Sequence, residues 1–128
     1  MKLLLDTCTF LWVLSGVPPL PPGVAAMVRN PDNEVFLSAV SAWEIGIKYA
    51  AGKLVLPEHP ERYVPTMRAE RGFTALPIDE ESTLHASRLP NLHRDPFDRL
   101  LVSQAIVHGM TILTSDRLIT QYPARTFW

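Results

Sequence analysis

Short apolar runs alternate along this chain with stretches that carry helical signals. Runs of four to six residues, bounded by turn or capping residues, are typical of strands buried on both faces of a sheet. Strands that alternate with helices pair in parallel through right-handed crossovers. We therefore predict an α/β fold, a three-layer α/β/α sandwich with a central, mainly parallel sheet of four or five strands, formed by residues 2–5, 34–39, 73–78, 110–113 and a terminal run at 125–128.

The helix boundaries follow from capping residues and from residues that break helices. Glycine ends several helical stretches, and Asp95-Pro96 starts one of them with a capping side chain followed by proline. Pro65 interrupts the helical hydrogen-bond pattern, so we expect the helix in that region to start near it. The predicted helices cover residues 7–15, 23–29, 41–51, part of 61–71, 79–88, 95–108 and 117–122.

The composition is that of one globular domain, which we expect to span residues 1–128. Hydrophobic residues make up 47% of the chain, and no apolar run approaches the roughly 20 residues of a membrane-spanning helix. Residues 1–5 could begin a secretion signal, but Asp6 interrupts the apolar stretch. The single cysteine, Cys8, excludes an internal disulfide and suits a reducing compartment. We expect a cytoplasmic protein with no membrane association, in which Cys8 is a small buried residue.

Four acidic residues lie where a predicted strand ends or a neighbouring helix begins: Asp6, Glu44, Asp98 and Asp116. A helix that follows a strand, and a helix that leads into the next parallel strand, both begin at the carboxyl edge of the sheet, where open α/β sheets bind ligands. All four side chains are therefore expected at this edge. Carboxylates within a few Å of one another stay ionised only if cations offset their repulsion, so the pattern predicts raised pKa values or bound Mg²⁺ or Mn²⁺.

Each of these acids also has a structural interpretation. Asp6 would be a helix cap, although Thr7 can take that role and free the Asp6 carboxylate. Glu44 would be a surface partner of Lys48, one helical turn away. An apolar stripe that includes Trp43, however, places Glu44 at its border, where a carboxylate needs a partner such as a metal ion.

Asp95, Asp98 and Asp116 have different predicted roles. Asp95 precedes Pro96 and has the position of a helix cap. Asp98 extends the core-facing row of its helix toward the sheet edge, which favours a functional role. Asp116 would cap the following short helix, and the Ser115 hydroxyl could bind water on a cation. The convergence of four acids is a stronger signal than any one position.

Four segments resemble the motifs of PIN-domain ribonucleases, and among these the VapC-type toxins of prokaryotic toxin–antitoxin pairs. The segments occur in the order and spacing of that family and span nearly the whole chain; they are Leu4-Leu5-Asp6-Thr7, Ser38-Ala39-Val40-Ser41-Ala42-Trp43-Glu44-Ile45, His93-Arg94-Asp95-Pro96-Phe97-Asp98-Arg99-Leu100-Leu101 and Leu113-Thr114-Ser115-Asp116. The resemblance implies a PIN fold and a metal-dependent endoribonuclease with a complete acidic quartet. Its catalytic residues would be Asp6, Glu44, Asp98 and Asp116, and its supporting residues Thr7, Ser115 and Asp95.

The resemblance also implies a cofactor and partners. One or two Mg²⁺ ions, with Mn²⁺ as a substitute, would be held by Asp6, Asp98 and Asp116, and by Glu44 directly or through water. The substrate would be single-stranded or looped RNA, and a VapB-like antitoxin protein would block the acidic cleft. A homodimer is expected. Core packing is the expected role of Trp43 and Phe97, rather than a protein interface.

The net charge of −1 is not that of a general nucleic-acid binder. If the four acids form one site, however, the remaining surface is net positive, and a basic rim could hold RNA phosphates. The cations nearest to the acids in the sequence are our candidates for this role, although each could equally be a solvated side chain; they are Lys48, Arg94, Arg99 and Arg117.

Two other functions fit parts of the sequence. Asp6-Thr7-Cys8-Thr9 approaches the Asp-x-Asp-x-Thr signature of phosphotransferases that form an aspartyl phosphate, but Cys8 occupies the place of the second aspartate. A receiver domain would need a phosphorylatable aspartate after a central strand, and Asp79 is better explained as a helix cap. The other alternative is a catalytically silent PIN-fold module that binds a protein without cleaving RNA.

Overall fold

The structure, a computed structural model that covers residues 1–128, contains one five-stranded sheet. Its strands are β1 (Lys2–Leu5), β2 (Glu34–Ser38), β3 (Thr74–Leu76), β4 (Thr111–Leu113) and β5 (Arg125–Phe127), in the order β3-β2-β1-β4-β5. Every neighbouring pair of strands is parallel. The predicted parallel sheet is confirmed, and the terminal run provides its fifth strand.

Six helices connect and flank the strands: α1 (Thr7–Ser15), α2 (Pro22–Arg29), α3 (Ala39–Ala50), α4 (Pro60–Glu70), α5 (Glu80–Ala86) and α6 (Pro96–His108). A short 3₁₀ helix, η1, covers Ile119–Gln121. Asp95 caps α6, as Asp95-Pro96 predicts, and Gly109 ends it with a φ of 67° that is unstrained only for glycine. None of the helices has the length and apolar character needed to cross a bilayer.

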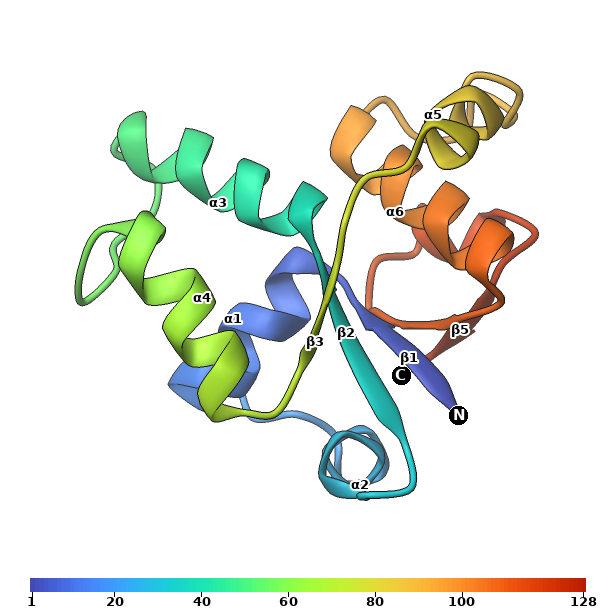
Figure 1. The fold of residues 1–128 in the computed structure, drawn as a ribbon. Helices are drawn as coiled ribbons and strands as arrows, with labels where there is room; N and C mark the ends of the chain where they lie inside the picture. The colour runs from blue at the N-terminus through green and yellow to red at the C-terminus, as the bar shows by residue number, and fades with distance from the viewer.

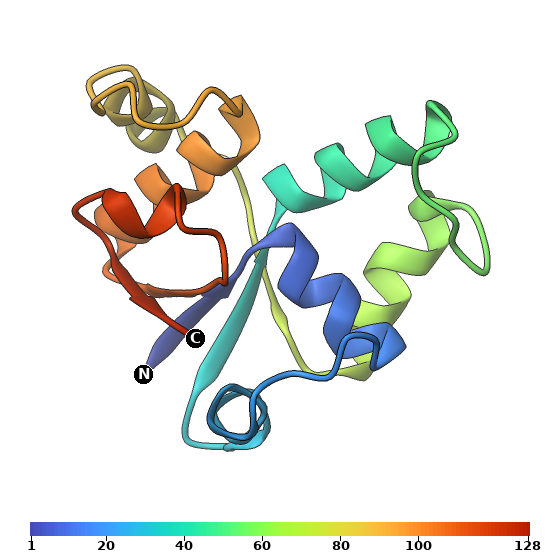
Figure 2. The same cartoon turned by 180° about the vertical axis from the view of Figure 1, so that it is seen from behind.

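Two hydrophobic clusters cover opposite faces of the sheet, because successive side chains of a strand point to opposite faces. Leu4 of β1 packs in one cluster with residues of α6, whereas Leu3 and Leu5 pack in the other with residues of α1, α2, α3 and α4. Figures 1 and 2 show the same division, with α5 and α6 on one side of the strands and α1, α3 and α4 on the other. The predicted three-layer sandwich is confirmed.

The strand order determines where a site can form. β1 lies at the centre, the chain passes from β1 to β2 on one side, and it later crosses from β3 to β4 on the other. The gap between β1 and β4 is therefore a topological switch point, and ligands of open α/β sheets bind outside the carboxyl ends of the strands at such a point. Asp6 directly follows β1, and Asp116 lies shortly after the end of β4.

The buried face of α3 differs from the predicted one. Ser38 caps the helix, which begins at Ala39, two residues earlier than expected. Trp43 is 57% exposed, so its assignment to the core is wrong, and its ring contacts Phe97 edge-on. Phe97 does pack against the core. The buried residues of α3 are instead Val40, Ser41, Glu44 and Ile45, because one part of this face looks onto a polar cavity.

The helix α4 passes through Pro65, so the expectation that it starts near this residue is wrong. Pro65 lacks the N–H that would donate to the carbonyl of Glu61. Both residues are exposed, and water can bind that carbonyl. Two further differences are smaller: β3 is shorter than the predicted strand, and the last predicted helix is a single 3₁₀ turn.

Cys8 is exposed on α1, so the prediction that it is a buried residue is wrong. It lies on the helix face beside the carboxyl edge of the sheet, next to Asp6 and Thr7. Partial desolvation, followed by the neighbouring charge of Asp6, raises the pKa of its thiol. The thiol is therefore kept protonated at neutral pH, where it is a poor nucleophile.

Candidate functional site

Acidic residues from four separate segments line one cavity at the carboxyl edge of the sheet. The cavity has a volume of about 140 Å³ and is lined by Asp6, Glu44, Asp98 and Asp116, by the predicted supporting residues Thr7, Asp95 and Ser115, and by Cys8, Trp12 and Lys48. A larger cavity of about 520 Å³ lies between α3 and α4, but none of the four acids lines it. The structure thus brings the predicted acids together.

Asp6 both caps α1 and forms part of the cavity wall. Its Oδ1 accepts a hydrogen bond from the Thr9 amide at 2.8 Å, and its Oδ2 accepts one from the Thr114 hydroxyl. The expectation that Thr7 would replace Asp6 as the cap is therefore wrong. Burial raises the pKa of Asp6, although these hydrogen bonds oppose the shift.

Glu44 on α3 is 4% exposed and has two partners. Its Oε1 accepts a hydrogen bond from the Thr7 hydroxyl at 2.6 Å, and its Oε2 accepts one from Lys48 Nζ at 2.5 Å. The pairing with Lys48 that the sequence suggests is present, but Glu44 is buried rather than on the surface. The hydrogen bond with Glu44 also raises the pKa of Lys48.

Asp98 is held in the first turn of α6, directly after the Asp95 cap. Asp95 Oδ1 accepts a hydrogen bond from the Phe97 amide at 2.9 Å, which leaves the Asp98 carboxyl group to line the cavity. Burial, and then the charges of Asp95 and Glu44, raise the pKa of Asp98 to about 7. Raised ionisation cost at a carboxyl group is the electrostatic pattern expected where acidic side chains are buried close together, and a divalent cation bound there would offset it.

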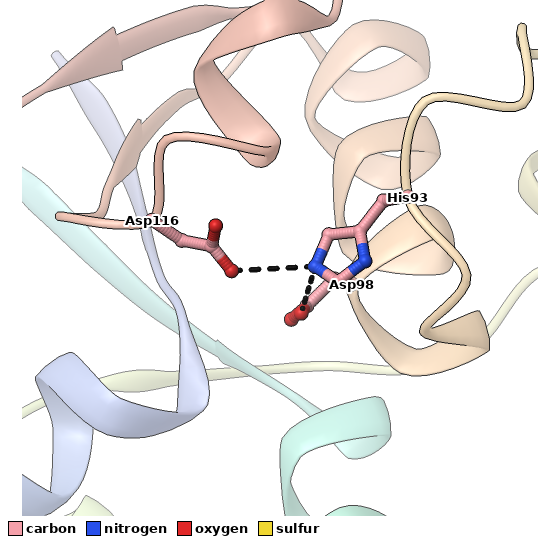
Figure 3. A group of neighbouring side chains, drawn as sticks. All are labelled: His93, Asp98 and Asp116. Atoms are coloured by element: carbon pink, nitrogen blue, oxygen red, sulfur yellow. Dashed lines mark hydrogen bonds and ion pairs between the residues drawn. The ribbon is translucent and has the colours of Figure 1, made fainter.

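His93 lies beside two of these acids, Asp98 and Asp116 (Figure 3). Its Nε2 lies 2.9 Å from Asp98 Oδ2 and 3.3 Å from Asp116 Oδ2. Asp116 Oδ1 accepts a hydrogen bond from the Leu118 amide at 2.8 Å and so stabilises a turn. The short helix η1 has no side-chain cap, so the interpretation of Asp116 as its cap is wrong. The ligand atoms of these three side chains lie within 4.8 Å of one another.

The sequence does not predict a role for His93. This residue stands five positions before Asp98, on the loop that precedes α6. Loops have no periodicity from which the direction of a side chain follows. The only sequence signal for His93 is its short distance from Asp98 along the chain. A side chain on a loop this close to the start of α6 can contact the first turn of that helix.

The predicted phosphate contacts lie in different environments. Arg94 and Arg117 are exposed and take part in no ion pair, whereas Lys48 is bound to Glu44. Arg99 donates to Tyr122 Oη, to the carbonyl group of Ala86 at the end of α5, and to two carbonyl groups of the loop before α6, those of Leu89 and Pro90. Both terminal nitrogens of Arg99 are therefore used inside the chain, which favours a structural role for this residue, and its contact with RNA phosphates stays a prediction.

The side chains at the cavity fit a divalent cation. Carboxylate oxygens are hard ligands of the kind that Mg²⁺ and Mn²⁺ bind. The contact of Asp98 with His93 involves only Oδ2, so Oδ1 can face a cation. Ser115 is exposed at the cavity, where its hydroxyl can bind water. The chemistry of this set of donors therefore suits a hydrated divalent ion.

Comparisons with known proteins agree with the fold and the site. The PIN domain family model matches residues 3–124. Ribonuclease VapC16 of Mycobacterium tuberculosis (strain ATCC 25618 / H37Rv) is 36% identical, over 62% of this chain and 62% of that protein. This chain thus matches less than two thirds of the length of that relative.

Solved structures share the fold at low sequence identity. The VapBC2 complex of Rickettsia felis, bound to a DNA fragment from its promoter, contains a chain with a TM-score of 0.73 and 16% identity, and the match covers 99% of this chain and 98% of that chain. The DNA-bound VapBC complex of Salmonella typhimurium contains a chain with a TM-score of 0.69 and 19% identity, and the match covers 99% of this chain and 97% of that chain. The match of a family model to nearly the whole chain shows that this protein belongs to the PIN domain family.

Proposed function

We propose that this protein is a metal-dependent endoribonuclease of the VapC type, which hydrolyses RNA phosphodiester bonds as the toxin of a toxin–antitoxin pair. The observation that carries the proposal is the convergence of four carboxyl groups on one cavity, those of Asp6, Glu44, Asp98 and Asp116. Clustered carboxylates that hold divalent ions beside a phosphodiester are suited to its hydrolysis. The similarity to a protein named as a ribonuclease, Ribonuclease VapC16, supports RNA as the substrate.

Asp6, Asp98 and Asp116 would hold Mg²⁺, or Mn²⁺ in its place, with Glu44 acting directly or through water. When bound, such an ion offsets the charge that develops on the phosphoryl and leaving oxygens and lowers the pKa of a water molecule. Thr7 donates its hydroxyl hydrogen to Glu44 and thereby fixes the direction of that carboxylate toward the cavity.

Cationic and aromatic side chains near the cavity would hold the RNA strand. Arg94 and Arg117 are exposed and form no ion pair, so they are available to contact RNA phosphates. Trp12 lines the cavity and offers an aromatic surface on which an unpaired base could stack. In the proposed reaction a water oxygen attacks phosphorus, the bond to the 3′ oxygen breaks, and that oxygen takes up a proton.

The proposed partner is a VapB-like antitoxin protein, and we also propose that the chain is a cytoplasmic homodimer. Structural similarity to the FitAcB complex of Neisseria gonorrhoeae, with a TM-score of 0.64, supports the partner in addition to the VapBC complexes. A surface that could serve either interface includes Trp43 and Ile47, which are 57% and 45% exposed on the same side of α3.

Cleavage of labelled RNA tests the proposed activity. Purified protein, freed of any partner, is incubated with labelled single-stranded RNA in Mg²⁺, in Mn²⁺ and in EDTA. We expect cleavage only with a divalent ion, and its loss in Asp6→Asn and Asp98→Asn, because each substitution removes a charged ligand while preserving the shape of the side chain.

Asp32→Asn is the matched control, because Asp32 lies in an exposed turn and does not line the cavity. This variant should cleave like the wild type. Full activity of Asp98→Asn, or cleavage by the wild type in EDTA, would overturn the metal-dependent mechanism. A folded protein that cleaves no RNA under any condition would instead favour the binding-module alternative.

A further inference from the structure

The imidazole of His93 has a hydrogen-bond partner on each ring nitrogen. Nε2 forms a hydrogen bond with Asp116 Oδ2 at 3.3 Å, and it also lies 2.9 Å from Asp98 Oδ2. Nδ1 accepts a hydrogen bond from the backbone amide of Asp95 at 3.2 Å. The side chain is 12% exposed, so these contacts form largely away from solvent. Nδ1 therefore faces a hydrogen-bond donor, and Nε2 faces carboxylate oxygens, which are acceptors.

These contacts determine which nitrogen carries the proton. An amide N–H points at Nδ1, so Nδ1 has to present its lone pair and cannot itself carry hydrogen. The proton of the neutral ring therefore lies on Nε2. A protonated Nε2 has no lone pair for a metal ion, and it is suited to donate to a carboxylate.

We propose that His93 is a positioning residue that uses its Nε2–H to bridge Asp98 and Asp116 and so holds these two carboxylates at a fixed separation. This inference rests on the proposed function, because it gives His93 a part in building the divalent-ion site. In this role His93 is not a metal ligand, even though its Nε2 lies close to two candidate ligands. The bridge uses one oxygen of Asp98, Oδ2, and not Oδ1.

The loop that carries His93 is itself anchored. The backbone amide of His93 donates to Tyr122 Oη at 2.9 Å, and Arg99 donates to the same oxygen at 3.0 Å. Tyr122 is 3% exposed, and Arg99 also binds carbonyl groups of this loop. A continuous set of hydrogen bonds thus runs from α6 and Tyr122 through His93 to the acids.

This arrangement brings together side chains that lie far apart in the sequence. Asp98 starts α6 and Asp116 follows β4, so no element of secondary structure sets the distance between their carboxyl groups. Two carboxylates that repel each other would otherwise turn apart in the absence of a cation. The Nε2–H group of His93, placed between the two carboxylates, opposes that movement. Because the carboxylates are already restricted, a metal ion loses less binding free energy to ordering them.

Histidine ¹⁵N chemical shifts in the metal-free protein test the tautomer directly. The chain contains four histidines, and the resonances of His93 are identified by their loss in His93→Gln. We expect the shift of an unprotonated Nδ1 and a protonated Nε2. A proton on Nδ1, or the averaged shifts of a ring that exchanges freely, would overturn the proposal.

Equilibrium binding of Mn²⁺, measured by calorimetry and by electron paramagnetic resonance, tests the positioning role. We expect His93→Leu to weaken binding by about 10- to 100-fold, the usual effect of removing a hydrogen-bond partner of metal ligands. His93→Gln should bind much more tightly than His93→Leu, because the glutamine amide can place an N–H near the position of Nε2. Wild-type affinity in His93→Leu would overturn the proposal.

The same samples separate positioning from coordination. If His93 were a ligand, the Mn²⁺ signal would show coupling to a directly bound ¹⁴N nucleus, and this coupling would disappear in His93→Gln. We expect no such coupling. If the wild type binds no Mn²⁺, the proposed nuclease function fails, and the ¹⁵N shifts of the metal-free protein still decide whether His93 forms the bridge. Tyr122→Phe, which removes only Oη, should broaden or shift the His93 resonances without removing them.

Discussion

Arginine side chains in this protein have different roles because their guanidinium groups face different acceptors. Arg99 reaches Tyr122 and the carbonyl groups of the end of α5 and of the loop that follows it, whereas Arg117 is exposed. A planar guanidinium can bind several fixed acceptors at once, which the ammonium group of lysine cannot do with the same geometry. The same residue type therefore anchors a loop at one position and is available to phosphates at another.

We expect Arg99→Lys to lower the free energy of unfolding by roughly 1.5–3 kcal/mol, because hydrogen bonds from a charged donor are lost while the charge is kept. Urea unfolding followed by circular dichroism measures this difference. Arg117→Lys is the matched control and should leave the unfolding midpoint unchanged. Equal midpoints for the two variants would show that Arg99 does not hold the loop.

The positions of the acids could be predicted from the sequence because the backbone places them. Asp6 follows a strand and Asp98 stands in a first helical turn, so the fold class alone puts them at the carboxyl edge. His93 and Arg99 could not be predicted in the same way. Their partners are set by the path of the loop before α6, and hydrophobic periodicity carries no information about that path.

The helices show where sequence patterns determine an element and where they do not. α6 begins after Asp95 and ends at Gly109, as its capping signals predict. α3 has a different buried face from the predicted one, because a helical stripe identifies a buried face only when that face is apolar. The inward residues Ser41 and Glu44 are polar, and they face hydroxyl groups and a cavity rather than a hydrocarbon layer.

The contact between α5 and α6 gives a prediction about pH. Asp79 caps α5 and pairs through Oδ1 with His108 Nε2 at 2.8 Å, near the end of α6. The hydrogen bond from His108 is the main reason that the pKa of Asp79 falls from 3.8 to about 2. An acid whose pKa is lower in the folded than in the unfolded chain stabilises the fold above the unfolded pKa. This stabilisation is lost as the pH falls from about 4 to about 2.

Asp79→Asn isolates this contribution, since asparagine can still cap the helix but cannot carry the charge. We expect the variant to be less stable than the wild type at pH 6, and the difference between their urea midpoints to shrink as the pH falls from about 4 to about 2. Taking the difference removes the effect of other carboxyl groups that titrate over this range. A difference that does not vary with pH would exclude the charged pair as its source.

At the scale of the whole molecule, the alternation of strands and helices was sufficient to predict the parallel sheet and its two covering layers. The strand order β3-β2-β1-β4-β5 could not be predicted, because apolar runs do not specify their neighbours. The convergence of the acids did not require this order, since all strands of a parallel sheet end at one edge. The exact distances between the carboxyl groups do depend on it, because β1 and β4 are adjacent and bring Asp6 and Asp116 to the same gap.

The folded chain should be stabilised by divalent ions, because folding creates the cluster that binds them. A ligand that binds only the folded state stabilises it by about 2.7 kcal/mol when its free concentration is roughly 100 times its dissociation constant. We therefore expect Mn²⁺ to raise the melting temperature of the wild type above its value in EDTA. Calorimetry at matched ionic strength measures the shift, and equal melting temperatures in Mn²⁺ and EDTA would contradict a site formed by folding.

The melting temperature of Asp98→Asn, compared with that of the wild type, should depend on whether Mn²⁺ or EDTA is present. Burial and the charges of Asp95 and Glu44 disfavour ionised Asp98, so a neutral asparagine relieves repulsion in the metal-free protein. In EDTA at neutral pH the variant should melt at or above the temperature of the wild type, and Mn²⁺ should raise its melting temperature much less. Asp32→Asn, outside the cavity, should respond to Mn²⁺ like the wild type. A variant that is destabilised in EDTA yet still stabilised by Mn²⁺ would mean that Asp98 supports the fold and does not bind the ion.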